Sequence, residues 1–185
     1  MKGRPMSCNS CCKKLKLICA ALLVLCSASV LANDWHAELP QAKPLGQGEL
    51  RWFGFSIYSA TLWSEYVPFD QTAPFALELT YHVHVTRERF VQTSLDEIKR
   101  LFDQRFSADK LKNWEALMSQ AFPEVHDGDQ LIGIFIPHQG CRFYDRSGLR
   151  IDIRDPEFAE AFFAIWLDPR SKDSKLRQHL LGITR

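Results

Sequence analysis

Hydrophobic and polar residues alternate with the period of a β-strand in two parts of the chain. Residues 49–63 and 75–85 both show this alternation and are rich in aromatic and β-branched side chains, which favour strands. Gly54 interrupts the first part, so we expect two strands there with a bend or bulge between them. Shorter apolar runs bounded by turn residues predict three further strands at 131–136, 141–144 and 149–153.

Helical spacing of apolar residues predicts helices between and after these strands. Thr86 can cap a first helix, and Ser107 or Asp109 can begin a second. Residues 158–167 predict a third helix, because Asp155-Pro156 supplies a capping side chain and a favourable first residue. Large apolar side chains occupy most of its circumference, so we expect this helix to be buried on nearly all sides.

The order of the elements predicts the fold class. Strands, helices, strands and helices follow one another without a regular βαβ alternation, which indicates an α+β fold with an antiparallel sheet and helices on one face. Residues 33–48 contain two prolines and two glycines, so we expect an irregular arm outside the core. A single domain over residues 33–185 is long enough for a sizeable core.

The first 32 residues have the organisation of a secretory signal peptide. Lys13, Lys14 and Lys16 precede an apolar stretch that runs to about Leu31, and small residues suit cleavage after Ala32. We therefore expect a signal peptide at 1–32 and a periplasmic or secreted protein. The apolar stretch is short for a membrane span, although an uncleaved anchor is the alternative.

Removal of this segment changes the charge and the cysteine count. The first 32 residues hold five of the 23 basic residues and none of the 22 acidic ones, so the rest of the chain is mildly acidic. This charge argues against nucleic acid as a partner. Cys141 is the only cysteine after residue 32, so we expect no internal disulfide and a small core residue there.

Three segments together resemble the bacterial chalcone isomerase-like family. They are residues 48–63, residues 76–81 with the following Ser94/Glu97/Ile98 helix, and residues 128–182 with the Phe143 hairpin, the 158–167 helix and Leu180-Leu181-Gly182. The resemblance implies an open-faced β-sandwich, in which helices layer on one face of a large antiparallel sheet above an apolar cleft. Enzymes of this fold close a flavanone ring in the cleft with an arginine, a threonine, a tyrosine and an asparagine. Other members bind fatty acids and hold the carboxylate with the arginine.

The catalytic set is poorly matched in this chain. By the resemblance, Ser56 stands at the position of the threonine, Phe90 at that of the tyrosine and Glu97 at that of the asparagine. The arginine has no counterpart at its expected position, and Arg51 is the nearest basic residue. Phenylalanine cannot donate a hydrogen bond to a developing enolate, and an anionic glutamate would repel a phenolate.

Three functions are consistent with these features. We prefer an exported, non-catalytic binding module for a small hydrophobic or fatty-acid-like ligand, without a cofactor, and we expect its cleft to be lined by Ser56, Tyr58, Tyr81, Phe90 and Glu97. The second is an isomerase or intramolecular lyase with a rearranged site that uses Ser56, Tyr58 and Arg51. The third is a structural or interaction protein without a cavity, which a filled interior and an exposed apolar patch would favour. The sequence leaves the ligand and the oligomeric state open.

His82 and His84 share one face of the strand predicted over 75–85, a spacing that metal sites use. The sequence offers no third ligand near them. We therefore assign both to a solvated sheet face and expect no metal site.

Overall fold

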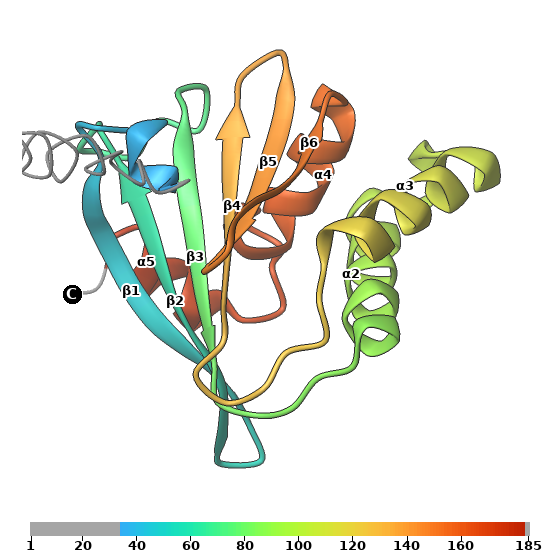
Figure 1. Ribbon diagram of the computed structural model, residues 1–185, viewed down its shortest axis with the longest axis horizontal. Coiled ribbons are helices and arrows are strands. Elements are labelled where there is room, and N and C mark those ends of the chain that lie inside the picture. Colours follow the sequence, from blue (N-terminus) through green and yellow to red (C-terminus); the bar gives the residue numbers. More distant parts are fainter. Residues whose placement is uncertain (1–33, 184–185) are drawn as a thin grey trace, which may run out of the picture. The chain divides into compact units, whose positions relative to one another are not determined.

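The structure, a computed structural model, describes residues 34–183. The signal peptide predicted at 1–32 lies outside the described residues. Within them, one six-stranded antiparallel sheet has its strands in sequence order (Figure 1). The strands are β1 (Lys43–Trp52), β2 (Phe55–Ser64), β3 (Phe75–Tyr81), β4 (Gln130–Ile136), β5 (Gly140–Asp145) and β6 (Gly148–Ile153).

The α-helices cover one face of this sheet. They are α2 (Arg87–Phe102), α3 (Ala108–Ala121), α4 (Pro156–Leu167) and α5 (Ser174–Leu180). The described residues also form two short 3-10 helices, η1 (Trp35–Ala37) and η2 (Asp103–Arg105). α4 packs on β4 and β5, α5 packs on β1 and β2, and α2 packs on α4. α3 packs against α2 and β6. The predicted α+β, open-faced arrangement is therefore confirmed. None of the helices in the described part of the chain has the length and apolarity that a bilayer crossing needs.

The local signals at the start of α4 act as expected. The Asp155 side chain accepts a hydrogen bond from the Phe158 backbone N at 3.0 Å, and Pro156 is the first helical residue. The other carboxylate oxygen of Asp155 accepts a hydrogen bond from Trp114 Nε1 at 2.8 Å. The helix cap therefore also ties α4 to α3, and seven of the twelve residues of α4 are buried.

The irregular arm predicted at 33–48 is wrong in its second half, because β1 begins at Lys43. Pro44 is tolerated because β1 is an edge strand, where a proline need not donate to the ladder. Gly46 marks a close approach rather than a loop. A Cβ atom there would lie 2.1 Å from the carbonyl oxygen of His179 in α5.

The first half of the predicted arm also belongs to the core. Trp35 and Leu39 are buried against the sheet face opposite the helices, together with Ile132, Ile134 and Tyr144. The Tyr144 hydroxyl donates to Glu38 at 2.8 Å. This segment therefore covers part of the outer face, which a two-layer arrangement leaves open.

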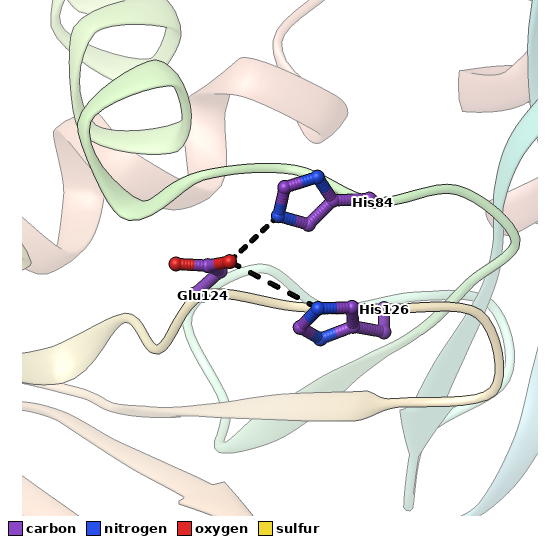
Figure 2. A group of neighbouring side chains, drawn as sticks. All are labelled: His84, Glu124 and His126. Carbon is purple, nitrogen blue, oxygen red and sulfur yellow. Dashed lines mark hydrogen bonds and ion pairs between the residues drawn. The ribbon is translucent and has the colours of Figure 1, made fainter.

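The strand predicted over 75–85 ends earlier, at Tyr81. The connection after it forms an isolated antiparallel bridge from Val85 to Val125. As a result, His84 does not lie on the sheet face but beside Glu124 and His126 (Figure 2).

Candidate functional site

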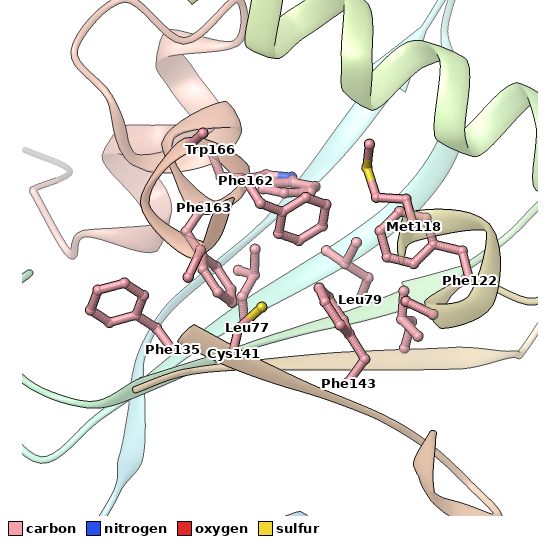
Figure 3. Packing of buried hydrophobic residues seen from close by; sticks show 14 of the residues in the cluster. Leu77, Leu79, Met118, Phe122, Phe135, Cys141, Phe143, Phe162, Phe163 and Trp166 are labelled. Atoms are coloured by element: carbon pink, nitrogen blue, oxygen red, sulfur yellow. The ribbon is translucent and has the colours of Figure 1, made fainter. Parts of the chain in front are cut away.

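The cleft that the fold would offer lies between the sheet and α4. Its walls are apolar and come from β3, β4, β5 and α4 (Figure 3). They consist of Leu77, Leu79, Leu131, Gly133, Phe143, Phe162, Phe163 and Trp166. The space left between them is only about 10 Å³, roughly what one water molecule requires. Side chains of the chain itself therefore fill the cleft.

Gly133 explains how the filling is achieved. A Cβ atom at this position would lie 3.0 Å from Cζ of Phe163 and 3.2 Å from Cε1 of Phe143. The missing side chain lets the Phe163 ring sit directly on the sheet. The ring therefore fills the space above Gly133.

A group of hydroxyl-bearing side chains lies at one end of this apolar wall. Tyr58 and Tyr81 are direct cross-strand partners in β2 and β3, with ring centroids 5.8 Å apart. Trp166 Nε1, from the apolar wall, donates to the Tyr58 hydroxyl at 2.9 Å. Ser56 lies two residues before Tyr58 on β2, and the pairing of β2 with β1 shifts by one residue between them. The Ser56 hydroxyl oxygen is buried and has no hydrogen-bond partner among residues 34–183.

The two phenols of this group remain protonated and neutral. Burial raises the pKa of Tyr58 above its usual range, and the hydrogen bond from Trp166 only partly offsets this effect. Burial also raises the pKa of Tyr81 well above its usual range, and the neighbouring Tyr58 adds to the shift. These side chains can therefore donate and accept hydrogen bonds, but they cannot act as bases near neutral pH.

Phe90 lies beside Tyr81 of this group and presents an apolar ring to it. Its ring is stacked on Phe122 with centroids 4.2 Å apart and meets Tyr81 edge-on at 5.7 Å. Phe90 is buried in the main core. It brings α2 against the end of the sheet and offers no donor there.

Glu97 has a different environment from the other candidates. Its side chain is 7% exposed and forms an ion pair with Lys172 at 2.8 Å and another with Arg100. Burial raises the pKa of Glu97, but the hydrogen bonds from Arg100 and Lys172 outweigh this effect, so the pKa lies below its usual value. Arg100 also donates to the Arg170 carbonyl at 2.7 Å. Arg170 and Lys172 both lie between α4 and α5, so Glu97 and Arg100 together attach this connection to α2.

Arg51 lies at the exposed end of β1. Its guanidinium is 3.5 Å from Glu49 and 3.4 Å from the Gly54 carbonyl, and its side chain is 63% exposed. Within the described residues the guanidinium makes no hydrogen bond to the side chain of Ser56 or Tyr58, although Arg51 is the cross-strand partner of Ser56. Arg51 instead borders an open depression of about 640 Å³ between the β1–β2 pair and α5, which Glu49, Asp173 and Lys175 also line. The lining of this depression is mixed, because Ala60 and Leu176 lie beside these charged residues.

The arginines around the β5–β6 hairpin are also engaged elsewhere. Arg142 pairs with Glu38 and Asp152, Arg150 pairs with Asp145, and Arg146 donates to the Gly128 carbonyl. None of the residues that line the apolar wall is basic. The hydroxyls of Ser56, Tyr58 and Tyr81 can therefore bind a neutral polar atom, and none of them bonds to a basic side chain within the described residues.

Comparison with known proteins agrees with this fold. A family model described as chalcone isomerase-like matches residues 48–182. The chain belongs to the chalcone isomerase-like family. An uncharacterized protein of Haemophilus influenzae is 29% identical over 173 residues, covering 93% of this chain and 80% of that protein. Among solved structures, an Arabidopsis thaliana fatty-acid binding protein superposes with a TM-score of 0.59 and 9% identity, covering 77% of this chain and 88% of the other.

Two features of this chalcone isomerase-like domain did not follow from the sequence. One is the cluster of His84, Glu124 and His126, whose members come from two separate connections. The other is the turn between β1 and β2, where Trp52, Phe53 and Phe55 are 67%, 86% and 72% exposed. The sequence predicts a bend at Gly54. It does not predict that the aromatic side chains on either side of the bend are exposed to solvent.

Proposed function

We propose that this chain is a non-catalytic binding protein for a small, mainly apolar molecule that carries one uncharged hydrogen-bonding group. The observation that carries the proposal is the buried hydroxyl of Ser56, two residues before Tyr58 on β2, which has no hydrogen-bond partner among the described residues. Leaving a buried polar atom without a partner costs about 1–3 kcal/mol. A ligand atom that bonds to Ser56 would recover this free energy.

The neutral character of the group argues for an uncharged ligand head. A carboxylate moved into this apolar surrounding would need a cation nearby. The basic side chains considered above are exposed or paired with acidic residues. We therefore expect an alcohol, aldehyde, ketone or ester to bind better than the fatty acid of the same chain length. The Arabidopsis neighbour, which is described as a fatty-acid binding protein, supports an apolar ligand body in this fold.

Binding requires the interior to open. The 10 Å³ between sheet and α4 cannot admit an acyl chain, so α4 must move away from β4 and β5 or Phe163 must turn aside. If α4 moves, the bond from Trp166 to Tyr58 breaks and frees a second hydroxyl for the ligand. We therefore expect slow binding that is limited by the opening step.

The same residues argue against isomerase activity. Ring closure needs a donor directed at the forming enolate and a group that steers the phenolate. Phe90 offers no donor, and Arg51 is directed at Glu49 and Gly54. We infer that chalcone-type substrates are not converted, which absorbance of the open-chain chalcone would test directly.

The test of the binding function begins with native mass spectrometry of the untagged protein, purified without detergent. We expect added mass that organic extraction removes. Titration with a long-chain alcohol and with the matching acid, followed by intrinsic tryptophan fluorescence, then measures the preference for the neutral head. Ser56→Ala should weaken alcohol binding about tenfold, as expected for one lost hydrogen bond. Ser59→Ala is the matched control, because the Ser59 hydroxyl, also on β2, already bonds to His82 at 2.7 Å. A protein that is free of ligand and binds neither compound would refute the proposal.

A second function is favoured by the aromatic tip of the β1–β2 hairpin. Phe53 has φ +46° and Gly54 has φ +84°, the left-handed pair of a two-residue hairpin turn. A bulky side chain is strained in this region, and Phe53 gains little burial from it, since its ring meets Trp52 edge-on at 5.1 Å but is 86% exposed. Strain that is retained with so little burial is typical of functional positions. Together with the filled interior, it supports a protein that binds a macromolecular partner through Trp52, Phe53 and Phe55.

Site-specific cross-linking separates this function from ligand binding. A photo-reactive residue at Phe53 should capture one defined partner in the native compartment. The same residue at Leu149, an exposed apolar side chain in β6, serves as the control. Equal labelling from both positions would refute a partner site at the tip.

We further propose that the protein is exported after cleavage behind Ala32. The basic and apolar segments at 13–31 support this proposal. The intact mass of the protein recovered from the periplasm or medium should begin at Asn33. A mass that retains the first 32 residues would show an uncleaved anchor instead.

A further inference from the structure

Two connections that run side by side bring together three metal-ligating side chains. His84 belongs to the segment between β3 and α2, and Glu124 and His126 belong to the segment between α3 and β4. Val85 and Val125 exchange both backbone hydrogen bonds, at 2.9 and 3.0 Å. His84 and His126 consequently face each other in the adjacent non-hydrogen-bonded pair, where cross-strand side chains approach most closely.

The donor atoms converge on one carboxylate oxygen. His84 Nε2 is 2.7 Å from Glu124 Oε1, and His126 Nε2 is 3.9 Å from the same atom (Figure 2). All three ligand atoms lie within 4.8 Å of one another. Ligands at about 2.1 Å from a tetrahedral ion are about 3.4 Å apart. Small side-chain rotations therefore suffice to enclose an ion, and the two imidazoles already stack with centroids 4.8 Å apart.

We propose that His84, Glu124 and His126 form a binding site for a divalent transition-metal cation, with Zn²⁺ as the best match. Two imidazole nitrogens and one carboxylate oxygen form a donor set that suits zinc, nickel or copper. Magnesium and calcium favour sites built from oxygen ligands. Three protein ligands leave a fourth position open, and the ligand side chains are between 50% and 65% exposed. Water or a small anion from solvent can occupy that position.

Asp129 contacts His126 on the side of the ring that faces away from Glu124. Its carboxylate accepts a hydrogen bond from the His126 backbone N at 2.8 Å and lies 3.7 Å from His126 Nδ1. A carboxylate on the far nitrogen of a ligating histidine orients the ring and leaves Nε2 free for the metal. Asp129 is therefore a positioning residue and not a ligand.

Calorimetric titration with ZnCl₂ tests the proposal on untagged protein, produced from its full coding sequence and treated with a chelator. We expect one zinc per chain, weaker nickel binding and no magnesium binding. His84→Ala, His126→Ala and Glu124→Gln should each weaken zinc binding about 100-fold or more, and Asp129→Asn should weaken it about tenfold. His82→Ala and His138→Ala are controls with unchanged affinity, because His82 bonds to Ser59 and His138 is exposed outside the cluster.

A second measurement guards against variants that do not fold. Zinc should raise the melting temperature of the parent protein and of both control variants, but not of folded ligand variants, since a cation that binds only the native state stabilises it. Absence of one-to-one binding at millimolar zinc would overturn the proposal. So would equal affinity in His84→Ala and the parent, because the cluster would then be only an exposed ion pair of little energetic value.

Discussion

Truncation of Trp166 tests whether the interior between sheet and α4 is a packed core. Trp166 is 6% exposed and lies edge-on to Phe162 with centroids 5.3 Å apart. Its indole N–H donates to the Tyr58 hydroxyl at 2.9 Å. Trp166→Ala removes the ring from a wall that holds almost no empty space, so the loss of burial and the new cavity should together cost about 3–5 kcal/mol.

The hydrogen bond to Tyr58 can be separated from the packing. Tyr58→Phe keeps the ring but leaves the buried indole N–H without an acceptor, which should cost about 1–3 kcal/mol. Trp166→Phe removes the donor and part of the ring. The double variant should then cost less than the sum of the two, because both polar partners are absent and neither is left unsatisfied.

Urea denaturation followed by far-ultraviolet circular dichroism provides the free energies of unfolding. Comparable slopes with urea in all variants would show that the native and unfolded states keep their compactness. A cost below about 1 kcal/mol for Trp166→Ala would refute the packed interior. Trp166 would then border an open, solvated cleft, and additivity in the double variant would refute the hydrogen bond.

The remaining predictions concern other contacts of the fold. Gly46→Ala should lower stability by about 1–3 kcal/mol, because its Cβ would meet the His179 carbonyl oxygen at 2.1 Å, whereas the nearest atom for Gly48→Ala is a flexible leucine methyl at 2.9 Å; equal changes in melting temperature would contradict this difference. The pKa of Glu97 is lowered in the folded state, so its ion pairs stabilise the protein above the unfolded value of 4.5 and the gain is lost as the pH falls below it. Glu97→Gln should therefore lose less stability than the parent between neutral pH and pH 3, and parallel pH profiles would exclude this role. Phe163→Ala should cost about 3–5 kcal/mol yet increase the affinity for an apolar alcohol, measured by thermal shift, and unchanged affinity would mean that the cavity collapses.

Signals that act over a few residues allowed most of the fold to be predicted. The capping aspartate and the proline after it define the start of α4, and continuous apolar spacing predicts its burial. Alternation in residues 49–63, divided at Gly54, and in 75–85 predicts strands that the structure contains as parts of β1, β2 and β3. Resemblance to the chalcone isomerase-like family then gave the layer order, and the family assignment is confirmed.

Features that depend on distant parts of the chain were missed. Gly46 reads as a loop residue until α5 is known to pack on it, more than a hundred residues later in the sequence. The sequence places Trp35 in an irregular arm, because several of its packing partners on the outer sheet face are about a hundred residues away in the chain. His84 and His126 are 42 positions apart, and only the Val85–Val125 bridge places them together. The contact between Tyr58 and Trp166 has the same origin.

Cys141 gives the protein a built-in reporter for the separation of α4 from the sheet. Cys141 belongs to β5, on which α4 packs, and its thiol is buried in the apolar core. Burial raises the pKa of Cys141 well above its usual range. A thiol reagent can therefore react only while the helix layer is lifted. In an exported chain that begins at Asn33 this is the only cysteine, so the labelling rate would count opening events without any engineered probe. A bound apolar molecule that holds the layers together or apart would change that rate, which makes the motion of α4 measurable before any ligand is identified.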